Sequence, residues 1–337
     1  MNRELAEKIA DTIMYEGYML YPYRPSALKN RQRWTFGILY PPAYAEVRAR
    51  TERSQMHSEC LLKASGKAAV QVRVRFLQLI MKQVSERVDQ AFKPVSSLII
   101  DGQLIESWDE GVERSAQLEL PIEGAAHSIE FCFPAGNSSE SLVNSAGKVV
   151  ANTIRTQHEI RGKLCASALK VRDDVWKLKI DVMNTSSQTF DGNNRNDALL
   201  RSMLTAHCIV SSVGAEFVSL LDPPEDLREI AESCANVGNF PVLVGEHCER
   251  EMMLCSPILL YDYPQVAPES AGDFFDATEM DEMLTLRVMT LSDDEKKEVR
   301  GNDRMRELLQ RTEQSAREQL NRTHGTIRGL HRIPEGS

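Results

Sequence analysis

The closest grouping of metal-binding side chains in this 337-residue chain is His247, Cys248 and Cys255. Two thiolates and an imidazole are typical zinc ligands, but a fourth ligand is missing nearby and the spacing matches no common zinc site. The seven cysteines are scattered and include no CxxC pair. Scattered thiols of this kind are usually packing residues, so these three residues are weak candidates for a metal site.

Motifs with a known catalytic mechanism are missing from the sequence. The chain lacks GxGxxG, GxxxxGK[ST], GxSxG and HExxH. The histidines show no paired ligand spacing, and His207, inside an alternating segment, is expected to be a structural or surface residue. We therefore predict no catalytic residue and no cofactor. A non-enzymatic role is favoured, although a site assembled from distant residues would leave no motif.

Aromatic and cationic side chains gather in residues 18–44, here called the Tyr/Arg segment. Tyrosine, tryptophan and arginine supply much of the binding energy in protein interfaces. The alternative is that the rings pack this segment onto the core. The candidates for partner binding are Tyr18, Tyr21, Tyr23, Arg24, Lys29, Arg31, Arg33 and Trp34.

Charge is distributed unevenly along the chain. Residues 24–53 contain seven Lys/Arg and two acidic residues, whereas residues 261–300, the acidic segment, contain eleven acidic residues and four Lys/Arg. Opposite charges favour contact within or between chains, and a small ligand with a phosphate is the alternative for the basic window. The further candidates for partner binding are Asp262, Asp273, Phe274, Phe275 and Asp276.

Apolar periodicity predicts the secondary structure. Residues 3–16 repeat apolar side chains every four positions, which is typical of a helix, and residues 70–76 and 176–182 alternate strictly, which is typical of half-buried strands. The runs 240–244 and 252–261 are typical of strands buried on both faces. Further alternating strands are expected at 116–120, 129–133, 164–168 and 204–210.

A hairpin and several more helices are also expected. Residues 56–64 are expected to pair with 70–76 across the turn Ser65-Gly66-Lys67. A helix over 80–92 would end before Pro94, and Asp222-Pro223 would begin a short helix that ends near Cys234. Two more helices are expected at 277–291 and 303–320.

Many short strands joined by turn-rich loops predict antiparallel pairing. The strands do not alternate regularly with long helices, which argues against a doubly wound α/β sheet. The expected fold is α+β and mainly antiparallel β, a β-sandwich-like core with an N-terminal helix and a helical C-terminal extension. We expect three parts: residues 1–50 with the helix and the Tyr/Arg segment, residues 51–265 as the β-rich core domain, and residues 266–337 as the acidic connector and extension.

Composition limits the classes of function. The chain is 42% hydrophobic and 26% charged with a net charge of −9, which is typical of a folded protein and argues against a general nucleic-acid binder. No apolar run reaches the roughly 18 residues of a membrane-spanning helix. The charged N-terminus does not resemble a secretory signal. Together with the scattered cysteines, this predicts the cytoplasm.

Five segments carry a family resemblance: YEGYMLYPYR (Tyr15–Arg24), KNRQRWTFGILYPP (Lys29–Pro42), NVGNFPVLVG (Asn236–Gly245), SPILLYDYPQVAPES (Ser256–Ser270) and GDFFDATEMDEMLTLRVMTLSDDEK (Gly272–Lys296). Together they resemble an uncharacterised bacterial family typically encoded beside the structural and maturation genes of uptake nickel–iron hydrogenases. The resemblance covers most of the chain and is looser between about Arg53 and Leu200. It carries over no catalytic residue, and it implies a cytoplasmic accessory role in making, assembling or supporting a hydrogenase.

These observations favour a non-enzymatic accessory or assembly protein that acts by protein–protein contact in a nickel–iron hydrogenase system. Its expected partner is a hydrogenase subunit or maturation factor, and neither nucleic acid nor a membrane span is expected. The alternative is a metal-handling factor or enzyme with a site near His247, Cys248 and Cys255. A third hypothesis is a structural subunit that stays in the final complex.

Overall fold

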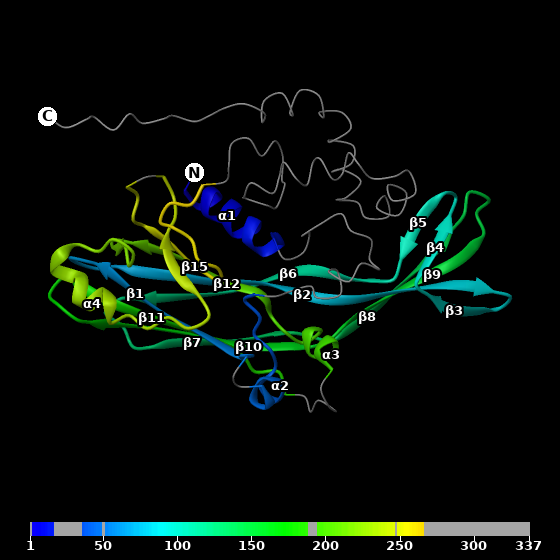
Figure 1. Cartoon of the computed structure of the whole chain (residues 1–337), viewed down its shortest axis with the longest axis horizontal. Coiled ribbons are helices and arrows are strands. Elements are labelled where there is room, and N and C mark those ends of the chain that lie inside the picture. Colours follow the sequence, from blue (N-terminus) through cyan, green and yellow to red (C-terminus); the bar gives the residue numbers. More distant parts are fainter. Residues whose placement is uncertain (1, 17–35, 49–50, 188–193, 247, 266–337) are drawn as a thin grey trace, which may run out of the picture.

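Antiparallel β-structure dominates the chain, and a helix of 15 residues, α1 (Asn2–Glu16), lies at its N-terminus. The computed structural model describes residues 2–16, 36–48, 51–187, 194–246 and 248–265. Two β-sheets face each other across a shared apolar core, and α1 covers the outer side of the larger sheet (Figure 1). The expected β-sandwich-like arrangement is therefore confirmed. The helices expected at 277–291 and 303–320 lie outside the described residues.

The smaller sheet has five antiparallel strands. In spatial order they are β13 (Glu216–Val218), β1 (Gln55–Lys63), β11 (Val175–Asn184), β10 (Ile160–Lys170) and β7 (His127–Phe133). Leu178, Ile180 and Val182 of β11 are buried, and the charged residues between them lie on the other face of the sheet. The alternation predicted for this segment therefore places one of its faces in the core.

The larger sheet is built around β2 (Ala69–Val88), a strand of 20 residues. Its main path runs β14 (Phe240–Leu243), β15 (Met252–Ser256), β12 (Leu204–Val213), β2, β9 (Val149–Gln157) and β8 (Gly136–Val143). The other edge of β2 pairs with β6 (Trp108–Pro121) and β3 (Ala91–Val95). A separate two-stranded sheet consists of β4 (Ser97–Ile100) and β5 (Gln103–Glu106).

Strands β1 and β2 face each other across the core and do not pair. Cys60 and Leu62 of β1 and Val70 and Val72 of β2 belong to one buried cluster between the sheets. The hairpin predicted across Ser65-Gly66-Lys67 is therefore wrong, since β1 pairs with β11 and β13 while β2 pairs with β6 and β12. Because both strands bury an apolar face against the same core, they lie in opposite layers, and the turn carries the chain between them.

The helix predicted over residues 80–92 is also wrong. Ile80, Val84 and Val88 recur at the four-residue spacing typical of a helix, but this segment forms the end of β2 and the start of β3. Its backbone pairs with β9 along one edge and with β3 along the other. The hydrogen bonds to these partners decide the conformation, because a short apolar pattern is compatible with either structure.

Helix α1 packs an apolar stripe against the outer face of the larger sheet. The buried residues of this stripe are Ala6, Ile9, Ala10 and Ile13. Ion pairs with β2 flank the stripe: Arg73 lies 2.7 Å from Glu7, and Arg75 lies 2.5 Å from Asp11. The helix predicted at residues 3–16 is therefore confirmed, and its amphipathic pattern explains how it docks.

Four short helical segments cover other parts of the two sheets. They are α2 (Pro42–Val47), α3 (Arg195–Leu199), η2 (Glu225–Leu227) and α4 (Arg228–Glu232). Leu227 of η2 and Ala231 of α4 pack against β1, β11 and β13. These two elements lie within the segment between Asp222 and Cys234, where a single short helix was expected. No helix in the described part of the chain has the length and apolar content needed to cross a membrane.

Beyond the core, the larger sheet continues without the smaller sheet opposite it, in a region here called the distal arm (residues 80–112 and 134–157). The arm contains the end of β2, all of β3, β4, β5, β8 and β9, and the start of β6. It extends away from the end of the molecule at which β1 and α4 lie (Figure 1). None of its residues, all of which the structure describes, belongs to the four buried clusters of the protein.

Candidate functional site

Most residues predicted to bind a partner lie outside the described part of the chain. These residues are Tyr18, Tyr21, Tyr23, Arg24, Lys29, Arg31, Arg33, Trp34, Asp273, Phe274, Phe275 and Asp276. Asp262 is described, and its carboxylate accepts hydrogen bonds from Ser219 Oγ at 2.5 Å and from the Leu243 N–H at 2.8 Å. These contacts fasten the chain after β15 to β14 and to the segment after β13.

Two tyrosines at the end of the Tyr/Arg segment pack into the interior. Tyr40 and Tyr44 are buried, and their ring centroids are 4.9 Å apart. Arg195 Nε donates a hydrogen bond to Tyr40 Oη at 3.1 Å, and the Arg48 guanidinium lies 4.5 Å from the centre of the Tyr44 ring. For this pair, packing is therefore the correct interpretation.

The two cysteine candidates for a metal site occupy different environments. Cys255 is buried in the core opposite Cys208 of β12, and burial raises the pKa of the Cys255 thiol to about 11. Cys248 is exposed, and His247 lies outside the described residues. In the part of the chain that the structure describes, no three or more His, Cys, Asp and Glu side chains form a group that could hold a metal ion.

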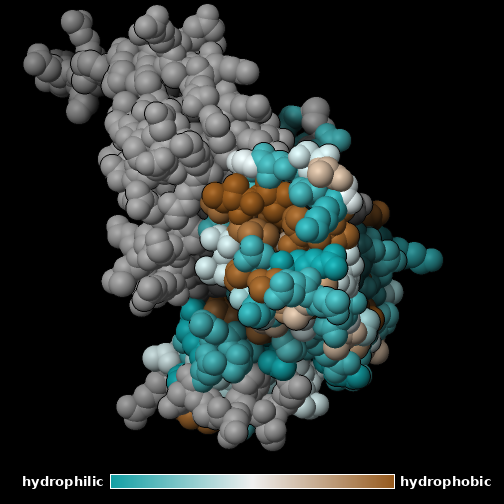
Figure 2. All heavy atoms as spheres, turned by 90° about the vertical axis from the view of Figure 1, so that its right-hand side faces the viewer, coloured by the Kyte–Doolittle hydropathy of each residue, from teal (hydrophilic) through white to brown (hydrophobic). Residues whose placement is uncertain are grey.

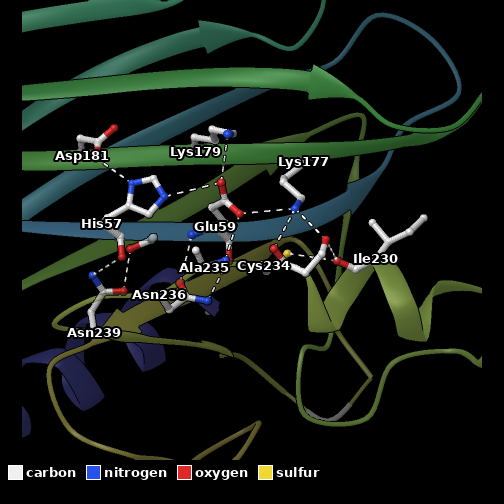
Figure 3. A network of polar contacts seen from close by, with 12 residues as sticks. His57, Glu59, Lys177, Lys179, Asp181, Ile230, Cys234, Ala235, Asn236 and Asn239 are labelled. Carbon is white, nitrogen blue, oxygen red and sulfur yellow. Dashed lines mark hydrogen bonds and ion pairs between the residues drawn. The ribbon is translucent and has the colours of Figure 1, made fainter.

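A polar network joins β1 to β11 and to the segment after α4, with the carboxylate of Glu59 at its centre (Figure 3). This side chain is 7% exposed and lies 3.0 Å from Lys179 Nζ and 3.4 Å from Lys177 Nζ. It also accepts a hydrogen bond from the Ala235 N–H at 3.0 Å. Burial alone would raise the pKa of Glu59, but the Ala235 hydrogen bond and the two lysines outweigh it and lower the pKa to about 2.

His57 lies beside Glu59 on the same face of β1. Its Nδ1 donates a hydrogen bond to Asp181 Oδ1 at 2.7 Å, and its Nε2 lies 3.6 Å from Glu59 Oε1. A general base needs a nitrogen or oxygen directed at the substrate. Each ring nitrogen of His57 is directed at a carboxylate of the protein instead, and the Glu59 carboxylate is surrounded by the protein's own donors. The network therefore has a structural role.

The network holds a short segment, here called the strap (residues 234–239), along the edge of β1. His57 and Val237 exchange two backbone hydrogen bonds of 3.0 and 2.9 Å. The Asn236 side chain accepts from the Glu59 N–H at 3.0 Å and donates to the Glu59 carbonyl at 3.2 Å. The strap thus satisfies backbone groups of β1 that would otherwise form an open sheet edge.

The segment Asn236–Gly245, one of those that carry the family resemblance, folds as the strap and β14. Gly238 has a φ of +84°, and an added Cβ would lie 2.5 Å from the Arg53 guanidinium. Asn239 Oδ1 accepts a hydrogen bond of 2.6 Å from Ser58 Oγ. The two asparagines and the glycine are therefore explained by how the strap fits against β1.

Sequence reasoning missed this network because its members come from distant parts of the chain. In the β1–β11 pair, Glu59 lies directly opposite Lys179, and His57 lies opposite Asp181. Opposite charges facing each other across two strands are mutually stabilising. The sequence does show a polar residue at every second position of both segments. This pattern indicates which residues meet only once the register of the two strands is known.

A second polar cluster lies between α1 and the larger sheet. His207 of β12 is fully buried opposite Arg75 of β2, and its Nδ1 donates to the Thr205 carbonyl at 2.8 Å. Burial lowers the pKa of His207 to about 4, and the nearby cations Arg75 and Arg73 add to the effect. His207 is therefore a neutral, structural histidine.

Exposed apolar side chains are found on the distal arm. Figure 2 faces the end of the molecule that the arm forms, and apolar atoms gather in one area of this face. On the arm, Ile99 is 68% exposed, Val143 56% and Phe92 42%. Single exposed apolar residues are common in soluble proteins, whereas a contiguous patch marks an interaction site. The arm is therefore our candidate for a site that contacts other molecules.

The two features differ in what they contact. The polar network binds the protein's own strap, whereas the distal arm presents apolar side chains to the solvent.

No protein-family model matches the sequence, and no curated protein matches it.

Proposed function

We propose that the protein is a non-enzymatic accessory or assembly protein of the cytoplasm, which acts by protein–protein contact in a nickel–iron hydrogenase system. The observation that supports contact as its mode of action is the set of exposed apolar side chains on the distal arm. The resemblance of the sequence to a family encoded beside hydrogenase genes supports the choice of partner, a hydrogenase subunit or maturation factor.

The energetics of the arm favour a binding role. An aliphatic side chain contributes roughly 1.5–3 kcal/mol when it is moved from water into an apolar environment. Ile99 and Val143 are more than half exposed, so most of this free energy is not used in folding. A partner that covered both side chains would gain it on binding, less the cost of ordering the interface.

A co-purification experiment tests this proposal. The tagged protein would be co-expressed with the large subunit of a nickel–iron hydrogenase and its maturation factors, and each component recovered would be quantified. Ile99→Asp places a charge on the arm, and Val213→Asp is the matched control, because Val213 is 77% exposed on β12, outside the arm.

We expect the wild-type protein and Val213→Asp to recover the same hydrogenase component, and Ile99→Asp to recover several-fold less. Failure of the wild-type protein to recover any hydrogenase component would refute the proposed system. Equal recovery by all three proteins would remove the arm as the contact surface. The Tyr/Arg segment and the acidic segment would then be the remaining predicted surfaces.

A further inference from the structure

The hairpin of β4 and β5 is apolar on both of its faces. In its register Leu98 lies opposite Ile105, and Ile99 lies opposite Leu104. Side chains of neighbouring positions in a strand point to opposite faces, so these two cross-strand pairs lie on different faces. A hairpin with one face on a core normally carries polar residues on the other. Here neither face is polar: the exposed Ile99 and the partly buried Leu104 form one face, and the partly buried Leu98 and Ile105 form the other.

Specific hydrogen bonds fix the hairpin at both ends. At its tip, the Asp101 carboxylate accepts from the Ser145 N–H at 2.5 Å and from Ser145 Oγ at 3.0 Å, which ties it to the turn between β8 and β9. At its base, Ser107 Oγ donates to the Val95 carbonyl at 2.6 Å and accepts from the Val84 N–H at 2.8 Å. The apolar side chains are therefore held in place before a partner binds, which lowers the entropy cost of binding.

The charges beside the hairpin indicate which partner fits. Residues 94–113 contain five acidic side chains and no lysine or arginine. Glu110 is paired with Lys82 and Arg155, and Glu113 is paired with Arg75. Asp101, at the tip of the hairpin, instead accepts its hydrogen bonds from the neutral Ser145. Two copies of this surface would bring like charges together, whereas a partner with basic residues beside an apolar segment would be attracted.

From these contacts we infer that the β4–β5 hairpin, centred on Ile99 and Leu104, is a docking surface for an apolar protein segment flanked by lysine or arginine. This inference rests on the proposed function, and it adds the surface and the chemistry of the partner. The apolar pairs supply affinity, and the acidic residues select a basic partner and exclude a second copy of the chain.

The test uses the full-length protein and two synthetic peptides of the same length, one of alternating leucine and lysine and one of alternating leucine and glutamate. Binding would be measured by fluorescence anisotropy. The variant Ile99→Asn/Leu104→Asn removes the apolar pair without changing the net charge, and Val213→Asn is the matched control at an exposed valine on β12. Circular dichroism would verify that all proteins are folded.

We expect the lysine peptide to bind the wild-type protein and Val213→Asn equally. It should bind the double variant about tenfold more weakly, and a tenfold change in affinity corresponds to about 1.4 kcal/mol of binding free energy. The glutamate peptide should not bind. Equal binding of the lysine peptide to all three proteins would show attraction by net charge alone and would overturn the inference. Dimerisation of the wild-type protein at low salt, lost in the double variant, would also overturn it and identify a second copy as the occupant.

Failure of this inference and failure of the proposed function give different results. If the double variant still recovers a hydrogenase component as the wild-type protein does, the hairpin is not the docking surface, although the proposed function stands. If the wild-type protein binds the lysine peptide through the hairpin but recovers no hydrogenase component, the surface stands and the proposed hydrogenase system is wrong.

Discussion

Replacing Glu59 with glutamine tests whether electrostatic attraction holds the strap against β1. The change keeps the size of the side chain and removes its negative charge. Lys177 is 13% exposed and loses its carboxylate partner. Breaking a buried ion pair from one side costs about 3–5 kcal/mol of stability, so we expect Glu59→Gln to lower the free energy of unfolding at neutral pH by about 3 kcal/mol or more.

The pKa of Glu59 predicts how this loss depends on pH. It is about 2 in the folded protein, against 4.5 for an ordinary glutamate. Between these values the unfolded chain binds more protons than the folded protein, so the contribution of Glu59 to stability grows as pH rises and is complete above pH 4.5. The full difference corresponds to about 3 kcal/mol, of which about 2 kcal/mol is lost when the pH falls to about 3.

Urea unfolding monitored by circular dichroism, near pH 7 and near pH 3, would measure this effect. The destabilisation caused by Glu59→Gln should be about 2 kcal/mol smaller at the lower pH. Glu225→Gln is the control, because Glu225 is 85% exposed in its pair with Arg228 and should change stability by less than about 1 kcal/mol. If Glu59→Gln lost the same stability at both pH values, or no more than the control, the strap would not depend on the Glu59 charge.

Three further predictions concern other buried or strained positions. The pKa of His207 is about 4, against 6.5 for an ordinary histidine, so the unfolded chain takes up a proton between these values and stability falls as pH drops from 6.5 towards 4; His207→Asn should remove this part of the pH dependence of urea unfolding. Gly238→Ala should lower stability by about 1–2 kcal/mol in thermal unfolding, since φ is positive and the Arg53 guanidinium must move. The exposed Cys132 and Cys248 should react with a thiol reagent in the native protein, whereas the three fully buried cysteines should react only after unfolding.

How far the sequence predicts the fold depends on where the partners of each segment lie. The alternation over 176–182 identifies β11, because the buried face of one strand is recorded in its own residues. The conformation of residues 80–92 cannot be read from these residues alone, since the pairing of Val84 with β9 and β3 depends on residues elsewhere in the chain. The same holds for Ser65-Gly66-Lys67, where the turn is local but the separation of β1 and β2 into two sheets is not.

The candidate site also has features that the sequence can predict and features that it cannot. The hairpin of β4 and β5 carries a signal that sequence reasoning could have used, because Asp101-Gly102 between two apolar runs is typical of a tight β-turn. That Ile99 stays 68% exposed was not predictable, since exposure depends on which other elements cover the hairpin. The pairing of Glu59 with Lys179 likewise requires the register of β1 and β11.

A surface that is apolar on both faces of a hairpin carries a risk of self-association, and the acidic residues of the arm counter it. An apolar run such as Leu98–Ile100, in which Ile99 is exposed, favours pairing with a second copy of itself unless a charge interrupts it. Asp101 follows this run directly and Glu106 follows the apolar run of β5, so two copies would meet with like charges at both ends. The same charges attract a basic partner over a distance of about 10 Å at moderate salt. Raising the salt concentration should therefore weaken binding of the basic partner and at the same time promote self-association, a pair of opposite trends that apolar contact alone would not produce.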